Sequence, residues 1–126
     1  MTEGVMSSSA EIIVQAQLDA YNARDIAALM RTYADDAQVF EHPNTLLADG
    51  ADAIRARQVE RFNEPNLHAA LQKRIVAGAT VIDHELIRRT FPEGPGTLEL
   101  VAIYRVENDR IKAAWFISGK KTLEAR

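Results

Sequence analysis

Two stretches in the second half of the chain are apolar at almost every position, and they limit the folds that the chain can adopt. Residues 98–106 have apolar side chains at both odd and even positions, and residues 111–117 follow the same pattern. Because side chains alternate between the two faces of a strand, a strand of this kind must be covered on both faces. The sheet that contains these two strands therefore needs a packing partner on each side.

The first half of the chain supplies a cover for one face. Three segments have apolar residues at spacings of three and four, which is typical of helices that bury one side. The first of them begins at Ser8, whose hydroxyl can cap the first turn while Glu11 completes a capping box. The three helices are expected at residues 8–23, 26–33 and 51–62.

Strands make up the rest of the chain. A short strand is expected at residues 37–41, before Pro43. From Leu67 onward the pattern is that of long strands, and turn signals at residues 77–79, 92–96 and 107–109 divide it into four. Helices first and strands last predict an α+β fold, in which three N-terminal helices pack on one face of a strongly curved, mostly antiparallel sheet.

The outer face of this sheet needs a different cover. Three helices can cover one face only, and a symmetric homodimer is the simplest way to cover the other. We therefore expect two copies of the chain to meet through Val101, Ile103, Trp115 and Ile117.

Length and composition exclude several classes of protein. A chain of 126 residues forms one domain, expected at residues 10–120, between a flexible N-terminus (1–9) and a C-terminal tail (121–126). The absence of cysteine excludes disulfides and thiol nucleophiles, and a net charge of −3 gives no general attraction to nucleic acid. No apolar run is long enough to span a membrane, and the N-terminus lacks the apolar core of a signal peptide. A cytoplasmic protein without nucleic-acid or membrane partners is expected.

Asp83, His84 and Glu85 form a cluster of potential metal ligands. Along a strand the two carboxylates share one face while His84 points to the other, so three ligands do not converge and no metal site is expected. We expect Asp83 and Glu85 to lie on the outer face of the sheet, paired with Arg88 and Arg89.

Short motifs spread along residues 14–118 resemble a known superfamily. They are residues 33–37, Val39, Glu41, Pro43, Gly50 and Ile54, and then residues 81–85, 101–106, 110–111 and 115–116. These motifs are similar to those of the NTF2-like superfamily, in its SnoaL-like and ketosteroid-isomerase-like branches. The resemblance implies a cone-shaped α+β barrel of the cystatin-like kind, with a pocket inside the curved sheet and a dimer contact on its outer face.

The resemblance also places candidate catalytic residues. Ketosteroid isomerases use an acidic base on the first short strand, opposite two proton donors. The base position falls on Glu41, and a bulge before the proline would turn its neighbour His42 inward instead. The donor positions fall on Gln17 and Ala102, so the oxyanion site of a steroid isomerase is largely absent.

Other expected pocket residues follow from the same comparison. A supporting tyrosine of the third helix is replaced by Gln58, whereas Tyr33 is retained. The acid that polyketide cyclases use on the last strand is replaced by Ser118. Phe62, Tyr104 and Phe116 complete the substrate-binding residues expected here.

Three functions remain open from the sequence. The first is a cofactor-free isomerase, cyclase or hydratase that acts on a hydrophobic carbonyl compound, with Glu41 as the proton-transfer base. The second is a non-catalytic module that binds a hydrophobic small molecule or a partner, and the third is a structural dimer with a filled core. The inward polar residues Gln17, Tyr33, Glu41 and Gln58 favour a pocket over a filled core. They do not separate catalysis from binding, because the alternative for Gln17 is a structural hydrogen bond to the sheet and that for Glu41 is a solvated strand end.

Overall fold

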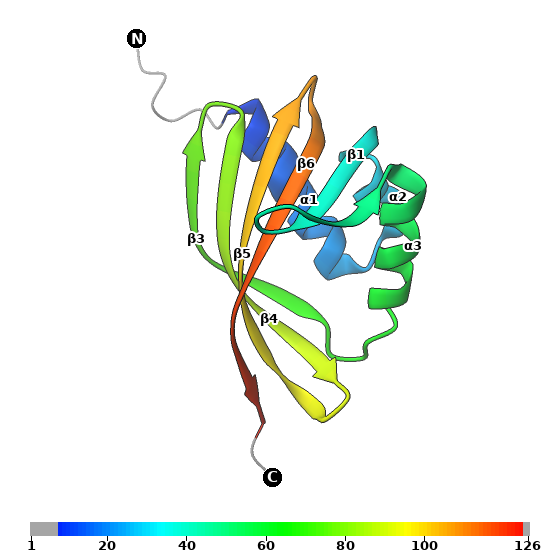
Figure 1. The fold of residues 1–126 in the computed structure, drawn as a ribbon, viewed down its shortest axis with the longest axis vertical. Helices are drawn as coiled ribbons and strands as arrows, with labels where there is room; N and C mark the ends of the chain where they lie inside the picture. The colour runs from blue at the N-terminus through cyan, green and yellow to red at the C-terminus, as the bar shows by residue number, and fades with distance from the viewer. Residues whose placement is uncertain (1–7, 125–126) are drawn as a thin grey trace.

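Within residues 8–124, three helices lie on one side of a single curved sheet (Figure 1). The computed structural model describes residues 8–124. The expected N-terminal segment therefore lies almost wholly outside the described residues, as does the end of the expected C-terminal tail. The elements are α1 (Ser9–Ala23), α2 (Ile26–Met30), β1 (Tyr33–Glu41), β2 (Thr45–Asp49), α3 (Ala51–Arg61), β3 (His68–Ala77), β4 (Thr80–Phe91), β5 (Gly94–Glu107) and β6 (Arg110–Leu123).

Side-chain caps mark the starts of the first two helices. The Ser8 hydroxyl accepts a hydrogen bond from the Glu11 N–H at 3.0 Å, which confirms the predicted Ser8 cap of α1. The Glu11 carboxylate does not complete the predicted capping box within residues 8–124, because it lies near Arg74 instead, at 3.9 Å. Asp25 caps α2 in the same way through the Ala28 N–H. The polypeptide leaves α1 through Arg24, which adopts the left-handed conformation at φ 55°.

The expected end of the second helix at Tyr33 is wrong. Helix α2 stops at Met30, and Tyr33 is the first residue of β1. The Thr32 carbonyl accepts a hydrogen bond from the Ile111 N–H at 2.7 Å, so the backbone here joins the sheet instead of continuing the helix. Pairing with a distant strand therefore overrides a local helical pattern.

The sheet has six strands in the order β2-β1-β6-β5-β4-β3. Strands β1 and β6 run parallel and every other neighbouring pair is antiparallel, which confirms the predicted α+β fold with a mostly antiparallel sheet. Strand β2 was not expected, because its five residues are too short for a clear alternating pattern. Strand β6 continues past residue 120, and Lys121 forms an ion pair with Glu93 at 2.9 Å, so the expected tail begins as ordered strand.

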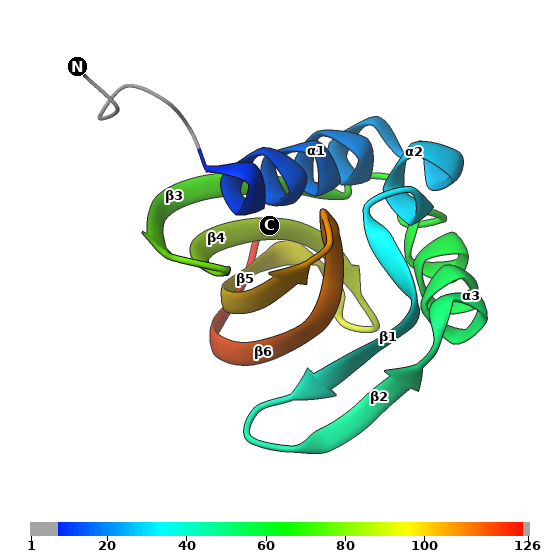
Figure 2. The ribbon, with the colours of Figure 1, turned by 90° about the horizontal axis from the view of Figure 1, so that it is seen from above.

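Strong curvature turns the sheet into a half-cone that α1 crosses (Figure 2). Helix α1 contacts β3, β4, β5 and β6, whereas α3 packs on β1 and β2. Register irregularities in β5–β6, such as the one between Leu98 and Leu100, sharpen the bend. Near the same place, a Cβ on Gly96 would lie 2.3 Å from the Thr122 carbonyl oxygen, so only glycine allows the two strands to approach so closely.

The residues of β5 and β6 divide between the two faces of the sheet as expected. Ala102, Tyr104 and Ala114 point inward and are buried against the helices. On the outer face, Trp115 stacks on Phe40 of β1 with ring centroids 5.8 Å apart.

None of the helices in residues 8–124 has the length and apolar character needed to cross a membrane.

Candidate functional site

A cavity of about 220 Å³ lies inside the curve of the sheet, beneath α1 and α3. Its apolar wall comes mainly from strands and consists of Leu18, Leu47, Ala69, Ile87, Leu98, Leu100 and Phe116. Its polar lining consists of Gln17, Tyr21, Tyr33, Glu41, Arg57, Gln58, Arg61, Glu85, Arg89, Tyr104 and Ser118. So many polar groups around one cavity are more than a packed core would tolerate without partners.

Among the acids that line the cavity, Glu85 has the most strongly shifted pKa. Its side chain points inward from β4 and is only 4% exposed, and it forms no hydrogen bond with any residue that the structure describes. Burial, assisted by the negative charge of Asp83, raises the pKa of Glu85 to about 7 against the opposing charge of Arg74. Near neutral pH this carboxyl group can therefore both take up and release a proton.

Buried tyrosines lie within electrostatic reach of Glu85. Tyr33 and Tyr104 are each 3% exposed and line the cavity. Burial, followed by the charge of Glu85, raises the pKa of both phenols. Both hydroxyls therefore stay protonated and can donate hydrogen bonds at any physiological pH.

Two glutamines leave polar atoms unpaired in the wall of the cavity. Gln17 of α1 is 6% exposed, and its Oε1 atom has no hydrogen-bond partner among residues 8–124. The Oε1 atom of Gln58 on α3 is buried without a partner in the same way. The alternative expectation for Gln17, a hydrogen bond that fixes it to the sheet, is not met by this atom. Buried polar atoms are nearly always paired, so these two oxygens are positions in the cavity wall that can accept hydrogen bonds from a molecule in the cavity.

The expectation that Asp83 and Glu85 lie on the outer face is wrong. Both are buried on the inner face of β4, in line with Val81 and Ile87. Asp83 binds Arg74 of β3 through two hydrogen bonds, of 2.7 Å from Nε and 2.9 Å from Nη2. Apolar residues flank the acids on both faces of β4, since Ile82 and Leu86 lie on the outer face, so the sequence pattern did not show which face is inside.

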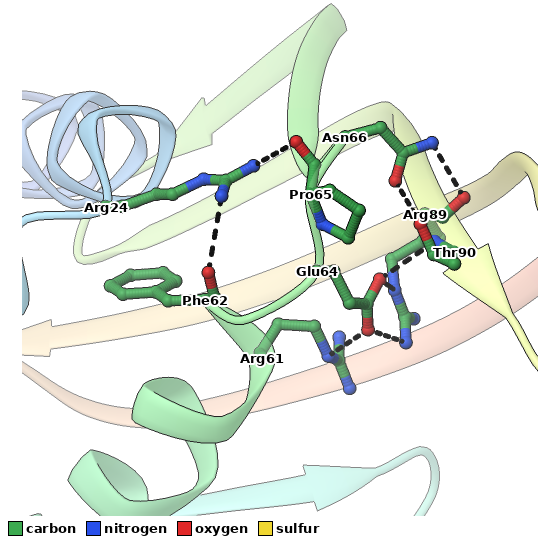
Figure 3. Close-up of polar contacts among 8 residues, drawn as sticks. All are labelled: Arg24, Arg61, Phe62, Glu64, Pro65, Asn66, Arg89 and Thr90. Carbon is green, nitrogen blue, oxygen red and sulfur yellow. Dashed lines mark hydrogen bonds and ion pairs between the residues drawn. The ribbon is translucent and has the colours of Figure 1, made fainter.

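Arg89 also has a partner that was not predicted. Its guanidinium donates two hydrogen bonds of 2.8 Å to the carboxylate of Glu64, in the loop between α3 and β3 (Figure 3). Glu64 Oε1 also accepts from the Thr90 N–H, and Glu64 Oε2 lies 3.5 Å from the Nε atom of Arg61. These contacts lower the pKa of Glu64, although burial acts in the opposite direction. Arg24 fixes the same loop from α1 by donating to the carbonyls of residues 62 and 65.

The cavity brings together seven of the ten site residues named from the sequence. These are Gln17, Tyr33, Glu41, Gln58, Tyr104, Phe116 and Ser118. Glu41 and Ser118 have exposed side chains, so they lie where the cavity opens to solvent. The burial expected for an inward Glu41 is not found.

His42, Phe62 and Ala102 are outside the cavity lining. His42 is exposed, and its backbone N–H donates to the Phe116 carbonyl. The Phe62 ring packs edge-on against Tyr21, with centroids 5.7 Å apart, and Ala102 is fully buried beneath the helices. The lining residues that sequence reasoning missed include Glu85 and the arginines at positions 57, 61 and 89. Within the described part of the chain, no three His, Asp or Glu side chains are grouped so as to hold a metal ion.

Solved structures share this fold. An uncharacterised cystatin-fold protein from Novosphingobium aromaticivorans is 25% identical, with a TM-score of 0.79 over 89% of this chain and 99% of that one. An LEH-like epoxide hydrolase from M. tuberculosis is 14% identical, with a TM-score of 0.77 over 88% of this chain and 83% of that one. A computationally designed 17-OHP binder is 15% identical, with a TM-score of 0.76 over 87% of this chain and 91% of that one.

Sequence comparison identifies the family. A search of the curated proteins gives no match. The sequence profile of the SnoaL-like domain, in contrast, matches residues 14–114, which is most of the chain. The chain therefore belongs to the SnoaL-like domain family, within the NTF2-like superfamily.

Proposed function

We propose that the chain binds a small, mainly apolar carbonyl compound in the cavity and transfers a proton at it through Glu85. The observation that carries the proposal is the buried Glu85 carboxyl, which faces the cavity without a hydrogen-bond partner and has a pKa near 7. A proton-transfer group is most effective when its pKa is close to the working pH. Isomerisation or cyclisation of the bound compound is the reaction class that this group would serve.

The proposed step is a proton transfer beside a carbonyl group. The Glu85 carboxylate takes a proton from carbon, and the C–H electron pair moves to form an enolate. The phenols of Tyr33 and Tyr104 are the donors available for the oxygen on which charge develops. The protonated Glu85 then returns the proton to another carbon, so that the step is balanced without a cofactor.

Glu41 is the alternative base, as proposed from the sequence. It also lines the cavity, but its side chain is exposed to solvent, so it lacks the desolvation that suits a carboxylate to remove a proton from carbon. A role for His42 would require a movement that brings it to the cavity. The second candidate function is ligand binding without chemistry, which the unpaired Gln17 and Gln58 oxygens support equally well.

Ring opening of nitrobenzisoxazole provides the test, because this neutral aromatic compound reports a carboxylate base in an apolar cavity. Removal of its C–H proton drives N–O cleavage and releases a coloured cyanophenolate. We expect the rate to rise with pH through about 7 and to fall about a hundredfold or more in Glu85→Gln. The exposed Glu60→Gln variant on α3 is the matched control and should retain the wild-type rate.

The outcomes of this test separate the proposals. Loss of rate in Glu41→Gln with retention in Glu85→Gln assigns the base to Glu41. Binding of the compound without ring opening above the rate in acetate buffer favours the non-catalytic function. Absence of both binding and ring opening contradicts a ligand-binding cavity.

We also propose that two copies of the chain associate through the outer face of the sheet. One apolar row crosses all six strands there, with each residue paired in register to the next. The row consists of Ile75, Ile82, Ile103, Trp115, Phe40 and Leu46. Ile75 is 56% exposed and Leu46 47%, and Val101 and Ile117 extend the apolar surface beside the row. An apolar surface that crosses a whole sheet is typical of an interface.

Trp115→Glu is expected to convert a dimer into a monomer or to cause aggregation, because it places a charge at the centre of this face. Sedimentation of the wild type should give twice the 14.0 kDa mass of the chain at micromolar concentration. Val59→Glu replaces another exposed apolar residue, on α3, and should leave the mass unchanged. A monomeric wild type contradicts the proposal.

A further inference from the structure

We propose that the cavity binds the carboxylate of an acidic, otherwise apolar ligand through Arg57. The inference rests on the proposed use of the cavity as a ligand site, and it names the chemical class of that ligand. It comes from the distribution of charge among the arginines that face the cavity.

Three arginines line the cavity, and two of them have an acidic partner. Arg89 forms paired hydrogen bonds with Glu64, and Arg61 lies 3.5 Å from the same carboxylate (Figure 3). Arg57, one helical turn before Arg61 on α3, forms no hydrogen bond or ion pair with any residue in 8–124. One cationic group of the wall is therefore left without a counterion.

The surroundings of Arg57 raise the free-energy cost of keeping its side chain charged. Its side chain is half-buried, and the charged groups that act on it most strongly are Arg61 and Arg89, which are also cations. Burial and these two charges lower the pKa of Arg57, although a guanidinium stays protonated at neutral pH. The groups that act in the opposite direction are the phenols of Tyr21 and Tyr33, which are uncharged at neutral pH and so provide no counterion. An anion that entered the cavity would supply the missing partner.

The geometry of the group and of the wall defines the ligand. A guanidinium presents a planar fork of N–H donors that matches a carboxylate with two parallel hydrogen bonds. Seven residues of the remaining wall are apolar, including Ile87, Leu98, Leu100 and Phe116, and three more are tyrosines. The volume of about 220 Å³ is below the roughly 300–1,000 Å³ of sites for drug-sized molecules, so the ligand is small. A compact aromatic or aliphatic acid fits these limits.

Two probes that differ only in their polar head test the inference. Naphthoate carries a carboxylate, and naphthamide has the same ring system with a neutral head of similar shape. We expect calorimetry at neutral pH to show that the wild type binds naphthoate about tenfold to a hundredfold more tightly than naphthamide. Arg57→Gln should abolish this preference while it leaves the affinity for naphthamide unchanged.

Two further variants and a thermal melt control for damage to the fold. Arg57→Lys keeps the charge but loses the fork, so it should retain part of the preference. Arg55→Gln removes the same charge from an exposed position of α3 outside the cavity and should bind like the wild type. If Arg57→Gln has the melting temperature of the wild type, its loss of preference for the carboxylate comes from the cavity and not from damage to the fold.

The possible failures are distinguishable. Binding of both probes with equal affinity to the wild type, or an unchanged preference in Arg57→Gln, overturns the carboxylate assignment and leaves the ligand-binding cavity standing. If neither probe binds to the wild type, the proposed ligand site fails together with this inference.

Discussion

Replacing Asp83 with alanine is expected to lower the free energy of unfolding by about 3–5 kcal/mol, the loss typical of breaking a buried ion pair from one side. Asp83 is completely buried, and the side chain of its partner Arg74 is only 10% exposed. Without the carboxylate, Arg74 keeps a hydrogen bond to the Gln15 amide and a distant contact of 3.9 Å with Glu11. Neither replaces the two hydrogen bonds to Asp83, so a poorly compensated cation would remain in the interior. Urea denaturation monitored by circular dichroism measures the loss.

A double variant separates the broken pair from general damage to the core. Asp83→Leu combined with Arg74→Met removes both charges and should recover most of the lost stability, because the buried pair is itself costly to desolvate. Arg88→Ala, on the exposed outer face of the same strand, should change the free energy of unfolding by no more than about 0.5 kcal/mol. A loss below about 1 kcal/mol in Asp83→Ala would show that the ion pair contributes little to the fold.

The four long strands could be predicted because their turns have a local chemical cause. Gly78 and Gly94 adopt positive φ, as do Asn108 and Asp109, and residues of these types enter that region most easily. These residues therefore mark the ends of the strands whichever strands pair with one another. The geometry of a strand, in which successive side chains point to opposite faces, also predicted correctly which residues of β5 and β6 share a face.

The start of the sheet could not be predicted from local pattern. Tyr33 continues a helical spacing, but the strand that it begins pairs with β6, almost 80 residues later in the chain. Strand β2 is held only by β1 at the edge of the sheet, so its five residues had no second neighbour to impose a pattern on them. Both depend on contacts between distant segments.

Only part of the candidate site could be predicted, because the rest also depends on contacts between distant segments. Positions inferred from the superfamily led to Gln17 and Gln58, which do line the cavity. Alternation placed Asp83 and Glu85 on one face but did not say that this face was inside, and charged residues were assigned to solvent. The partner that allows Asp83 to be buried is Arg74, from another strand, and only the assembled sheet reveals it.

The second large effect is a change in how stability depends on pH, and it comes from Glu85. The folded chain holds the Glu85 proton up to a pKa of about 7, whereas the unfolded chain releases it near 4.5. The raised pKa therefore takes nothing from the free energy of unfolding below pH 4.5 and has its full destabilising effect above pH 7. Between these values the stability falls as pH rises. At about 1.4 kcal/mol per pKa unit the loss is about 3 kcal/mol.

Glu85→Gln removes this titration while it keeps the shape of the side chain. The variant should match the wild type near pH 4 and exceed its free energy of unfolding by about 3 kcal/mol at pH 8, as measured by urea denaturation at both pH values. The exposed Glu60→Gln variant should follow the wild-type curve throughout. Parallel curves for Glu85→Gln and the wild type would show that the carboxyl group is not desolvated in the fold. If Glu85→Gln is more stable than the wild type at neutral pH and has also lost proton transfer, then Glu85 serves the chemistry at the expense of the stability of the fold.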